Sequence, residues 1–264
     1  MKIAICVSGE TRDFNKILKD TSHRSVLDFA EDLRKFNTQV DVYAHTWAHC
    51  EYPDRSDMIK SLSIDDQSII DNWVSGDFLN RAFPIPNAGS FHDYLLASRK
   101  AYGQVFSGFR CFGLVPVNEY DVVIRFRWDL ECVGDLEFIE KVFLPIAKQL
   151  AITDKDVTRG VGTSDIIIES SQHQTRTVIQ DSFFMLNSRG HDYITAQSIE
   201  DKLEDIFRDY PGNEKTTTHN LWFDCIFTPP RFKNPDPIYR KIGFDMSMPA
   251  HMFQIIKKNY SLED

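Results

Sequence analysis

Charged and large apolar side chains alternate in the segment 125–131, which reads Arg-Phe-Arg-Trp-Asp-Leu-Glu. In a strand, this alternation places Arg125, Arg127 and Asp129 on one face. Charges in such a place are costly unless they are paired or bound to a ligand. Asp129 and Glu131 form an acid-x-acid pair that can hold a divalent cation and, through it, a diphosphate. The arginines would orient the carboxylates or contact the ligand that carries the diphosphate, and the alternative is a structural Arg–Asp network.

A small polar turn follows the first apolar run of the chain, 3–7. Ligands of open α/β sheets bind beyond the carboxyl ends of the strands, so this turn is a second candidate site. Its backbone N–H groups could approach a nucleotide or phosphate, and its arginine could pair with the charge. The turn is neither a Walker loop nor GxGxxG, and an ordinary turn with a surface arginine is the alternative. Its members are Ser8, Gly9, Glu10, Thr11 and Arg12.

Further candidates are an aspartate and several histidines. Asp181 opens an apolar segment and could act as a general base or bind a sugar hydroxyl, although aspartate in such a place is equally a turn or helix cap. His45 and His49 lie at a strand end, where strand spacing does not bring them together, so we expect structural roles for them. His219 or His251 could complete a metal site.

Apolar periodicity predicts the elements that must position these residues. The runs 3–7 and 40–46 are typical of buried parallel strands, and the segment 15–36 between them has partly helical spacing. Together they form a strand–helix–strand unit. A third strand is expected over 120–130. The remaining expected elements are short helices over 59–62 and 68–74, a long helix over 91–112, strands over 166–169 and 182–186, and helices over 192–209 and 220–227.

Composition restricts the classes of protein that fit. The chain has 264 residues and a net charge of −9, which disfavours a nucleic-acid binder, although a basic stretch lies near the C-terminus. Five scattered cysteines without a CxxC pair indicate neither a disulfide framework nor a zinc knuckle, and favour a reducing cytoplasm. No apolar run approaches the length of a membrane span. No GxSxG, HExxH, kinase or P-loop signature occurs. We therefore expect a soluble, cytoplasmic, single-domain α/β protein.

Three ordered motifs and one later segment resemble a family of glycosyltransferases found in large bacteriophages, algal viruses and bacterial surface-polysaccharide clusters. The motifs are KIAICVSGETR (2–12), VDVYAHTW (40–47) and YDVVIRFRWDL (120–130), and the later segment is DSF (181–183). This sequence departs from the family at Glu10, where glutamine is frequent, and at Trp128, where proline is frequent. The resemblance covers about the first half of the chain.

The resemblance implies a GT-A-like (Rossmann-like) fold, with a central mixed, mostly parallel sheet flanked by helices. It also implies a nucleoside-diphosphate sugar as donor, with a UDP-sugar favoured, and Mn²⁺ or Mg²⁺. Ser8, Gly9 and Arg12 would line the nucleotide site. Asp129 and Glu131 would take the place of the acidic metal motif, with Arg125 and Arg127 beside them.

On this basis, residues 1–264 would form one domain, with a nucleotide-sugar-binding part over about 1–135 and an acceptor-side part over about 136–264. The expected activity is hexosyl or pentosyl transfer to a hydroxyl group. The acceptor would be a surface glycan or a hydroxymethylated pyrimidine of phage DNA, and a phage-encoded enzyme would act in the host cytoplasm. The alternatives are a non-catalytic nucleotide- or sugar-binding protein and a nucleotidyltransferase, which would release pyrophosphate.

Overall fold

A six-stranded sheet with the order β3-β2-β1-β4-β7-β6 forms the centre of the protein in a computed structural model. The strands have the bounds β1 Lys2–Ser8, β2 Gln39–Trp47, β3 Ile59–Asp65, β4 Val122–Arg127, β6 Ile166–Ile168 and β7 Phe183–Asn187. A separate pair is formed by β5 Leu130–Cys132 and β8 Phe253–Ile255. The structure describes residues 1–11, 14–15, 24–73, 91–132, 134–152, 166–168, 183–196, 198–199 and 253–255.

The sheet is mixed and mostly parallel. β1 pairs in parallel with β2 on one side and with β4 on the other, and β3 extends the parallel part beyond β2. β7 runs antiparallel to both β4 and β6. The fold class expected from the sequence, α/β with a mixed, mostly parallel sheet, is confirmed.

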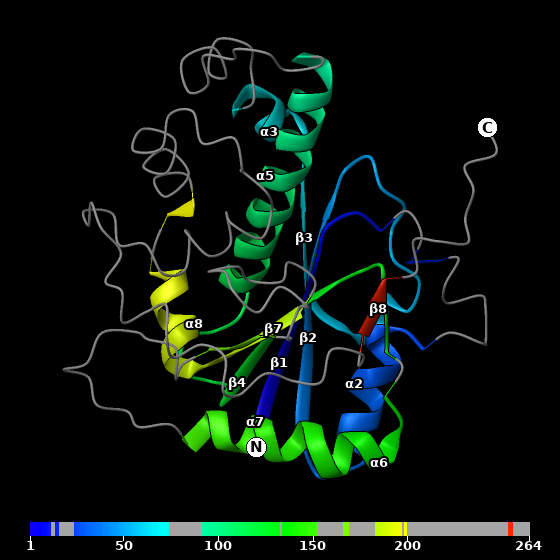
Figure 1. Cartoon of the computed structure of the whole chain (residues 1–264), viewed down its shortest axis with the longest axis vertical. Helices are drawn as coiled ribbons and strands as arrows, with labels where there is room; N and C mark the ends of the chain where they lie inside the picture. Colours follow the sequence, from blue (N-terminus) through cyan, green and yellow to red (C-terminus); the bar gives the residue numbers. More distant parts are fainter. Residues whose placement is uncertain are drawn as a thin grey trace.

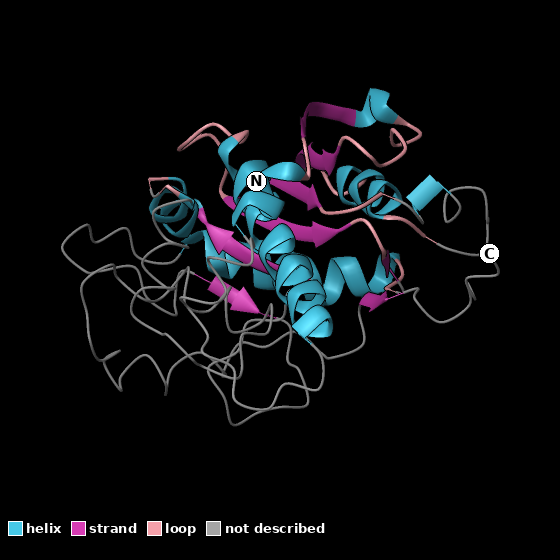
Figure 2. Cartoon of the chain, turned by 90° about the horizontal axis from the view of Figure 1, so that it is seen from above, coloured by secondary structure: helices cyan, strands magenta, loops and turns pink. Residues whose placement is uncertain are grey.

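Helices cover both faces of the sheet. Figure 1 draws α5 and α8 on one side of the strands and α2 on the other, and Figure 2 shows the strands between the helices. Helix α7 packs on the same face as α2. The helical segments have the bounds α2 Val26–Arg34, η1 Ser56–Met58, α3 Ser68–Trp73, α5 Phe91–Gly113, α6 Leu136–Phe138, η2 Ile139–Phe143, α7 Leu144–Ile152 and α8 Ser188–Thr195. Among the described residues, no helix combines the length and the apolar character that crossing a bilayer requires.

Alternate residues of the central strands point to the two helical layers. Ile3, Ile5 and Val7 of β1 belong to the apolar core on the α2 and α7 face. The intervening Cys6 and Ser8 are also buried. Burial on both faces explains why β1 reads as a continuous apolar run.

Several elements expected from the sequence are confirmed. Helix α5 covers the expected helix 91–112, and α3, β6 and β7 lie within one or two residues of their expected places. Helix α2 is described from Val26, within the expected helix 15–36, and Ser25 caps it. The expected helix 192–209 is placed wrongly at its start, because helix α8 runs over Ser188–Thr195, and residues 200–209 as well as the expected helix 220–227 lie outside the described residues.

Two expectations about elements need correction. The predicted helix over 59–62 is wrong, because these residues form β3, which pairs in parallel with β2. The half-buried edge of the sheet favours strand geometry over local helix preference. The continuous helical segment 136–152 was not predicted. A signal for it exists, since the side chain of Asp135 accepts a hydrogen bond from the backbone N–H of Phe138 as an N-cap.

Candidate functional site

The strand order creates a topological switch point between β1 and β4. The connection from β1 to β2 carries α2 on one face of the sheet, whereas α5, on the opposite face, precedes β4. At such a point the loops leaving two neighbouring parallel strands diverge, and ligands of open α/β sheets bind beyond the carboxyl ends of those strands. Ser8 and Arg127 are register partners at these ends. Both sequence-predicted segments therefore meet at one place.

Gly9 directly follows β1 with a backbone φ of 116°, a conformation that side-chain-bearing residues rarely adopt. A Cβ atom at this position would meet no other atom within 4 Å. The glycine is therefore required by its backbone conformation and not by crowding. Its backbone borders open space at the edge where a ligand would approach.

Arg127 and Asp129 form a forked ion pair. The Nε and Nη2 atoms of Arg127 lie 2.8 and 2.5 Å from the two carboxylate oxygens of Asp129. The side chains are 9% and 18% exposed, so the pair is largely withdrawn from water. Two parallel N–H···O bonds to one carboxylate form a strong and directional ion pair. The Arg–Asp network that the sequence left as an alternative is thus present at the switch point.

Arg125 lies two residues before Arg127 on β4, further from the carboxyl end of the strand. It is fully buried and in register with Cys6. Burial and the neighbouring Cys111 raise the pKa of the Cys6 thiol, and the positive charge of Arg125 partly opposes this shift. The two arginines of the motif therefore differ in their surroundings. Arg125 supports the sheet from within, and Arg127 lies at the edge.

The loops after β1 and β2 are bound to each other. The hydroxyl of Thr11 donates a hydrogen bond of 2.5 Å to the carbonyl oxygen of Glu51. Asn15 donates to the carbonyl oxygen of Tyr52 and accepts from the backbone N–H of Asp54. Residues 48–54 were not predicted to belong to the site. They contact the β1 turn because β2 is its parallel neighbour and ends at the same edge.

The rim of this edge also carries charge. The carboxylate of Glu10 lies 4.0 Å from Nε2 of His49. Both side chains are partly exposed. Phe14 packs edge-on against Trp128 with ring centroids 4.6 Å apart, which joins the β1 loop to the residue before Asp129.

His45 belongs to a buried polar network below this edge. Its Nε2 lies 3.0 Å from the carboxylate of Asp65, and its Nδ1 lies 2.5 Å from the hydroxyl of Ser107. Burial lowers the pKa of His45 to about 4, although Asp65 acts in the opposite direction. The order Asp–His–Ser is that of a hydrolase triad, but Ser107 is fully buried within α5 and no substrate reaches it. The backbone oxygen of His45 instead accepts a hydrogen bond from the indole of Trp128, so the network positions the β4 loop.

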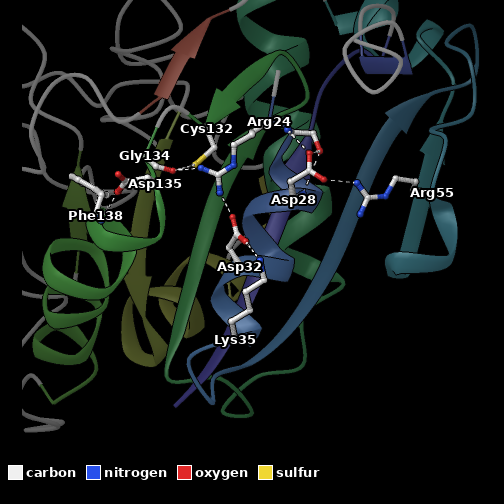
Figure 3. A network of polar contacts seen from close by, with 10 residues as sticks. Arg24, Asp28, Asp32, Lys35, Arg55, Cys132, Gly134, Asp135 and Phe138 are labelled. Carbon is white, nitrogen blue, oxygen red and sulfur yellow. Dashed lines mark hydrogen bonds and ion pairs between the residues drawn. The ribbon is translucent and has the colours of Figure 1, made fainter. Parts of the chain in front are cut away.

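A second network fastens the segment after β4 onto α2 (Figure 3). Arg24 donates hydrogen bonds to the carbonyl oxygen of Gly134 and to the carboxylate of Asp32. The backbone N–H of Cys132 donates to the carbonyl oxygen of Arg24 at 2.8 Å. These contacts hold β5 against α2, and β5 carries Glu131 opposite Gln254 of β8. The backbone of Glu131 therefore follows the switch point closely, while its side chain lies outside the described part of the structure.

Four of the sequence-predicted site residues lie outside the described residues: Arg12, Asp181, His219 and His251. Within the part of the chain that is described, no group of three or more His, Cys, Asp or Glu side chains is placed to hold a metal ion. The described residues thus bring Ser8, Gly9, Arg127 and Asp129 together, and the assignment of a cation to Asp129 and Glu131 stays a prediction.

No family model matches the chain, and a search of curated proteins finds no match. Several solved glycosyltransferase structures are similar at low identity. The galactosyltransferase LgtC, in complex with donor and acceptor sugar analogs, is 10% identical with a TM-score of 0.44, over 96% of this chain and 86% of that chain. Mouse xyloside xylosyltransferase 1 is 9% identical with a TM-score of 0.36, over 86% and 81%. The glycosyltransferase GlyE of Streptococcus pneumoniae TIGR4 is 11% identical with a TM-score of 0.39, over 86% and 44%. With TM-scores below 0.5, these similarities assign no residue and no activity to this chain.

Proposed function

We propose that this protein is a glycosyltransferase that moves a sugar from a nucleoside-diphosphate sugar to a hydroxyl group of an acceptor. The observation that carries this proposal is the meeting of the β1 turn and the β4 end at the switch point of the sheet, with an arginine and a carboxylate at the edge. This is where α/β sheets bind nucleotides and phosphates. The three ordered motifs that resemble phage, viral and bacterial glycosyltransferases support the same activity.

Each residue of the site has a defined role in this proposal. The β1 turn, Ser8 to Arg12, would hold the nucleotide through backbone N–H groups and the charge of its arginine. Arg127 would bind donor phosphate oxygens through its guanidinium fork, and buried Arg125 would support it. Asp181 would accept the proton of the attacking hydroxyl or orient the acceptor.

Asp129 and Glu131 would hold Mn²⁺ or Mg²⁺. A bound dication supplies charge that stabilises the leaving diphosphate. Hard carboxylate oxygens suit these ions. In the described structure, however, both carboxylate oxygens of Asp129 accept hydrogen bonds from Arg127. The carboxylate is therefore free to coordinate a cation only when Arg127 has another partner.

The finer assignments follow from the resemblance and from the charge of the chain. A UDP-sugar is the favoured donor, and either a hexose or a pentose would suit the proposed reaction. For the acceptor, the net charge of −9 favours a glycan over hydroxymethylated DNA, because an acidic protein is repelled by the phosphate backbone. The site of action would be the cytoplasm, which in the phage case is that of the host.

Thermal unfolding with a panel of nucleotide sugars, with Mn²⁺ or with EDTA, tests the donor class, because a ligand that binds the native state raises the midpoint. Release of the nucleoside diphosphate and transfer to a hydroxyl acceptor are then measured for the stabilising donor. Asp129→Asn should abolish transfer and leave the circular dichroism spectrum unchanged. Undiminished transfer by this variant would refute the cation role. Binding without turnover would indicate a non-catalytic binding protein, and release of pyrophosphate would indicate a nucleotidyltransferase.

A further inference from the structure

The forked pair of Arg127 and Asp129 places two proposed ligand-binding groups in contact with each other. Arg127 engages both oxygens of the carboxylate, at 2.8 and 2.5 Å. The two side chains are 9% and 18% exposed, so little water screens the pair. The carboxylate that would attract a cation is therefore already neutralised by a guanidinium.

A divalent cation that approaches Asp129 in this arrangement meets a positive charge at contact distance. Repulsion between the guanidinium and the cation is strong where water is largely excluded. The guanidinium also occupies the lone pairs that face it on both carboxylate oxygens. Without a donor, a cation can therefore bind Asp129 only after Arg127 has released the carboxylate. The stability of the Arg127–Asp129 ion pair opposes this release.

A diphosphate offers Arg127 a replacement partner. The guanidinium fork matches phosphate oxygens as well as it matches a carboxylate. Arg127 is the register partner of Ser8, so a phosphate bound at the turn after β1 would lie beside it. An arginine that moves from Asp129 to the phosphate leaves the carboxylate free for a cation.

We propose that Arg127 caps Asp129 until a phosphate-bearing donor takes the guanidinium, so that the donor and the divalent cation bind synergistically. This inference rests on the proposed function for the identity of the two ligands. By linkage, the cation must strengthen nucleotide binding by the same factor with which the nucleotide strengthens cation binding.

The test measures Mn²⁺ binding directly, by titration calorimetry and by the electron paramagnetic resonance signal of free Mn²⁺, with no turnover. Arg127→Gln removes the cap and should bind Mn²⁺ alone about 10-fold more tightly than the unmodified protein, within the usual range of coupling between sites. The same variant should show a smaller strengthening of Mn²⁺ binding on addition of UDP. The double variant Arg127→Gln/Asp129→Asn should lose this gain in Mn²⁺ affinity, which would show that the gain comes from the freed carboxylate of Asp129.

Arg55→Gln is the matched control. Arg55 pairs with Asp28 of α2 at 2.6 Å (Figure 3) and with Glu31 at 2.9 Å, so its replacement removes the same charge and also releases carboxylates. The Mn²⁺ affinity of this variant should stay within about twofold of that of the unmodified protein, since the Arg55–Asp28 pair, with side chains 32% and 33% exposed, is better screened by water than the Arg127–Asp129 pair. Arg127→Met removes both the charge and the fork while keeping a long side chain, and serves in place of Arg127→Gln if the latter fails to fold.

The outcomes separate this inference from the proposed function. Equal Mn²⁺ affinity and equal UDP coupling in the Arg127 variants and the unmodified protein would overturn the capping role, even if the protein transfers sugar. A gain in Mn²⁺ affinity that requires Asp129, in a protein that transfers no sugar from any donor, would keep the capping role and refute the proposed function. A gain of the same size in Arg55→Gln would reduce the effect to net charge and overturn the inference.

Discussion

At the scale of single residues, the candidate site depends on one backbone conformation and one ion pair. The φ of 116° at Gly9 lets the chain turn sharply at the end of β1. On the neighbouring strand, the forked pair between Arg127 and Asp129 holds the end of β4. Both features lie where the strand register brings Ser8 and Arg127 together.

Gly9→Ala should destabilise the protein by about 1–3 kcal/mol, because alanine would be held in a sparsely populated backbone conformation. Since a Cβ here meets nothing within 4 Å, the cost comes from the backbone and not from a clash. Gly113→Ala is the control, as a Cβ there also meets nothing within 4 Å and alanine is favoured in a helix. Urea unfolding measures both. An equal, small effect of the two substitutions would contradict the strain at Gly9.

His45 makes stability depend on pH. Burial lowers its pKa in the folded protein to about 4, from 6.5. Above pH 6.5 the imidazole is neutral in both the folded and the unfolded protein, and its contribution to the free energy of unfolding is fully present. As pH falls from 6.5 to about 4, the unfolded chain binds a proton that the folded protein does not, so stability decreases by up to about 3 kcal/mol.

The free energy of unfolding, measured across this pH range for the unmodified protein and for His45→Gln, checks this expectation. The variant should be less stable at pH 7 and should show a shallower slope between pH 6.5 and 4. A residual slope is expected from His191, because burial also lowers its pKa. Identical slopes for the two proteins would show that His45 is not the source.

At the scale of elements, the start of α2 is set by a capping box. The hydroxyl of Ser25 accepts a hydrogen bond from the backbone N–H of Asp28, and the carboxylate of Asp28 accepts one from the backbone N–H of Ser25. The cap matters for the site because α2 carries Asp32, which holds Arg24 and through it the segment after β4.

Ser25→Ala should lower the free energy of unfolding by about 1 kcal/mol, because it leaves an N–H group of the first helical turn without its acceptor. Ser25→Gly is the matched comparison and should cost only a few tenths of a kcal/mol. Thermal or urea unfolding distinguishes the two. If the glycine variant is the less stable one, the hydroxyl contributes little and the capping interpretation fails.

At the scale of the whole molecule, the net charge of −9 bears on the acceptor. With saturating donor, transfer to a glycan should change by less than about twofold between about 50 and 200 mM salt, because an acceptor without phosphate groups makes no phosphate contacts that salt would weaken. A DNA acceptor would lose affinity by several orders of magnitude over the same range. Transfer rates at subsaturating acceptor, measured at several salt concentrations, decide between the two. A steep decrease would reverse the preference for a glycan.

The sequence by itself determined the α/β class and the two segments of the candidate site. Continuous apolar runs mark strands that are buried on both faces, and polar residues that follow such runs mark carboxyl ends, so segment 125–131 and the β1 turn were identifiable from residue types alone. The same local patterns failed at residues 59–62, because a short half-buried segment becomes strand or helix according to the neighbour it pairs with.

Only the tertiary structure decided which of these residues meet. The order β3-β2-β1-β4 places the β1 turn beside the end of β4, and hydrogen bonds join the β2 loop over 48–54 to the segment after β1. It also decided that Arg127 holds Asp129, a choice that the sequence left open between a structural pair and a cation site. Strand order and register bring together residues that lie more than a hundred positions apart in the sequence. An ion pair depends on the distance between the two side chains in space, and the spacing of the residues along the chain does not specify that distance.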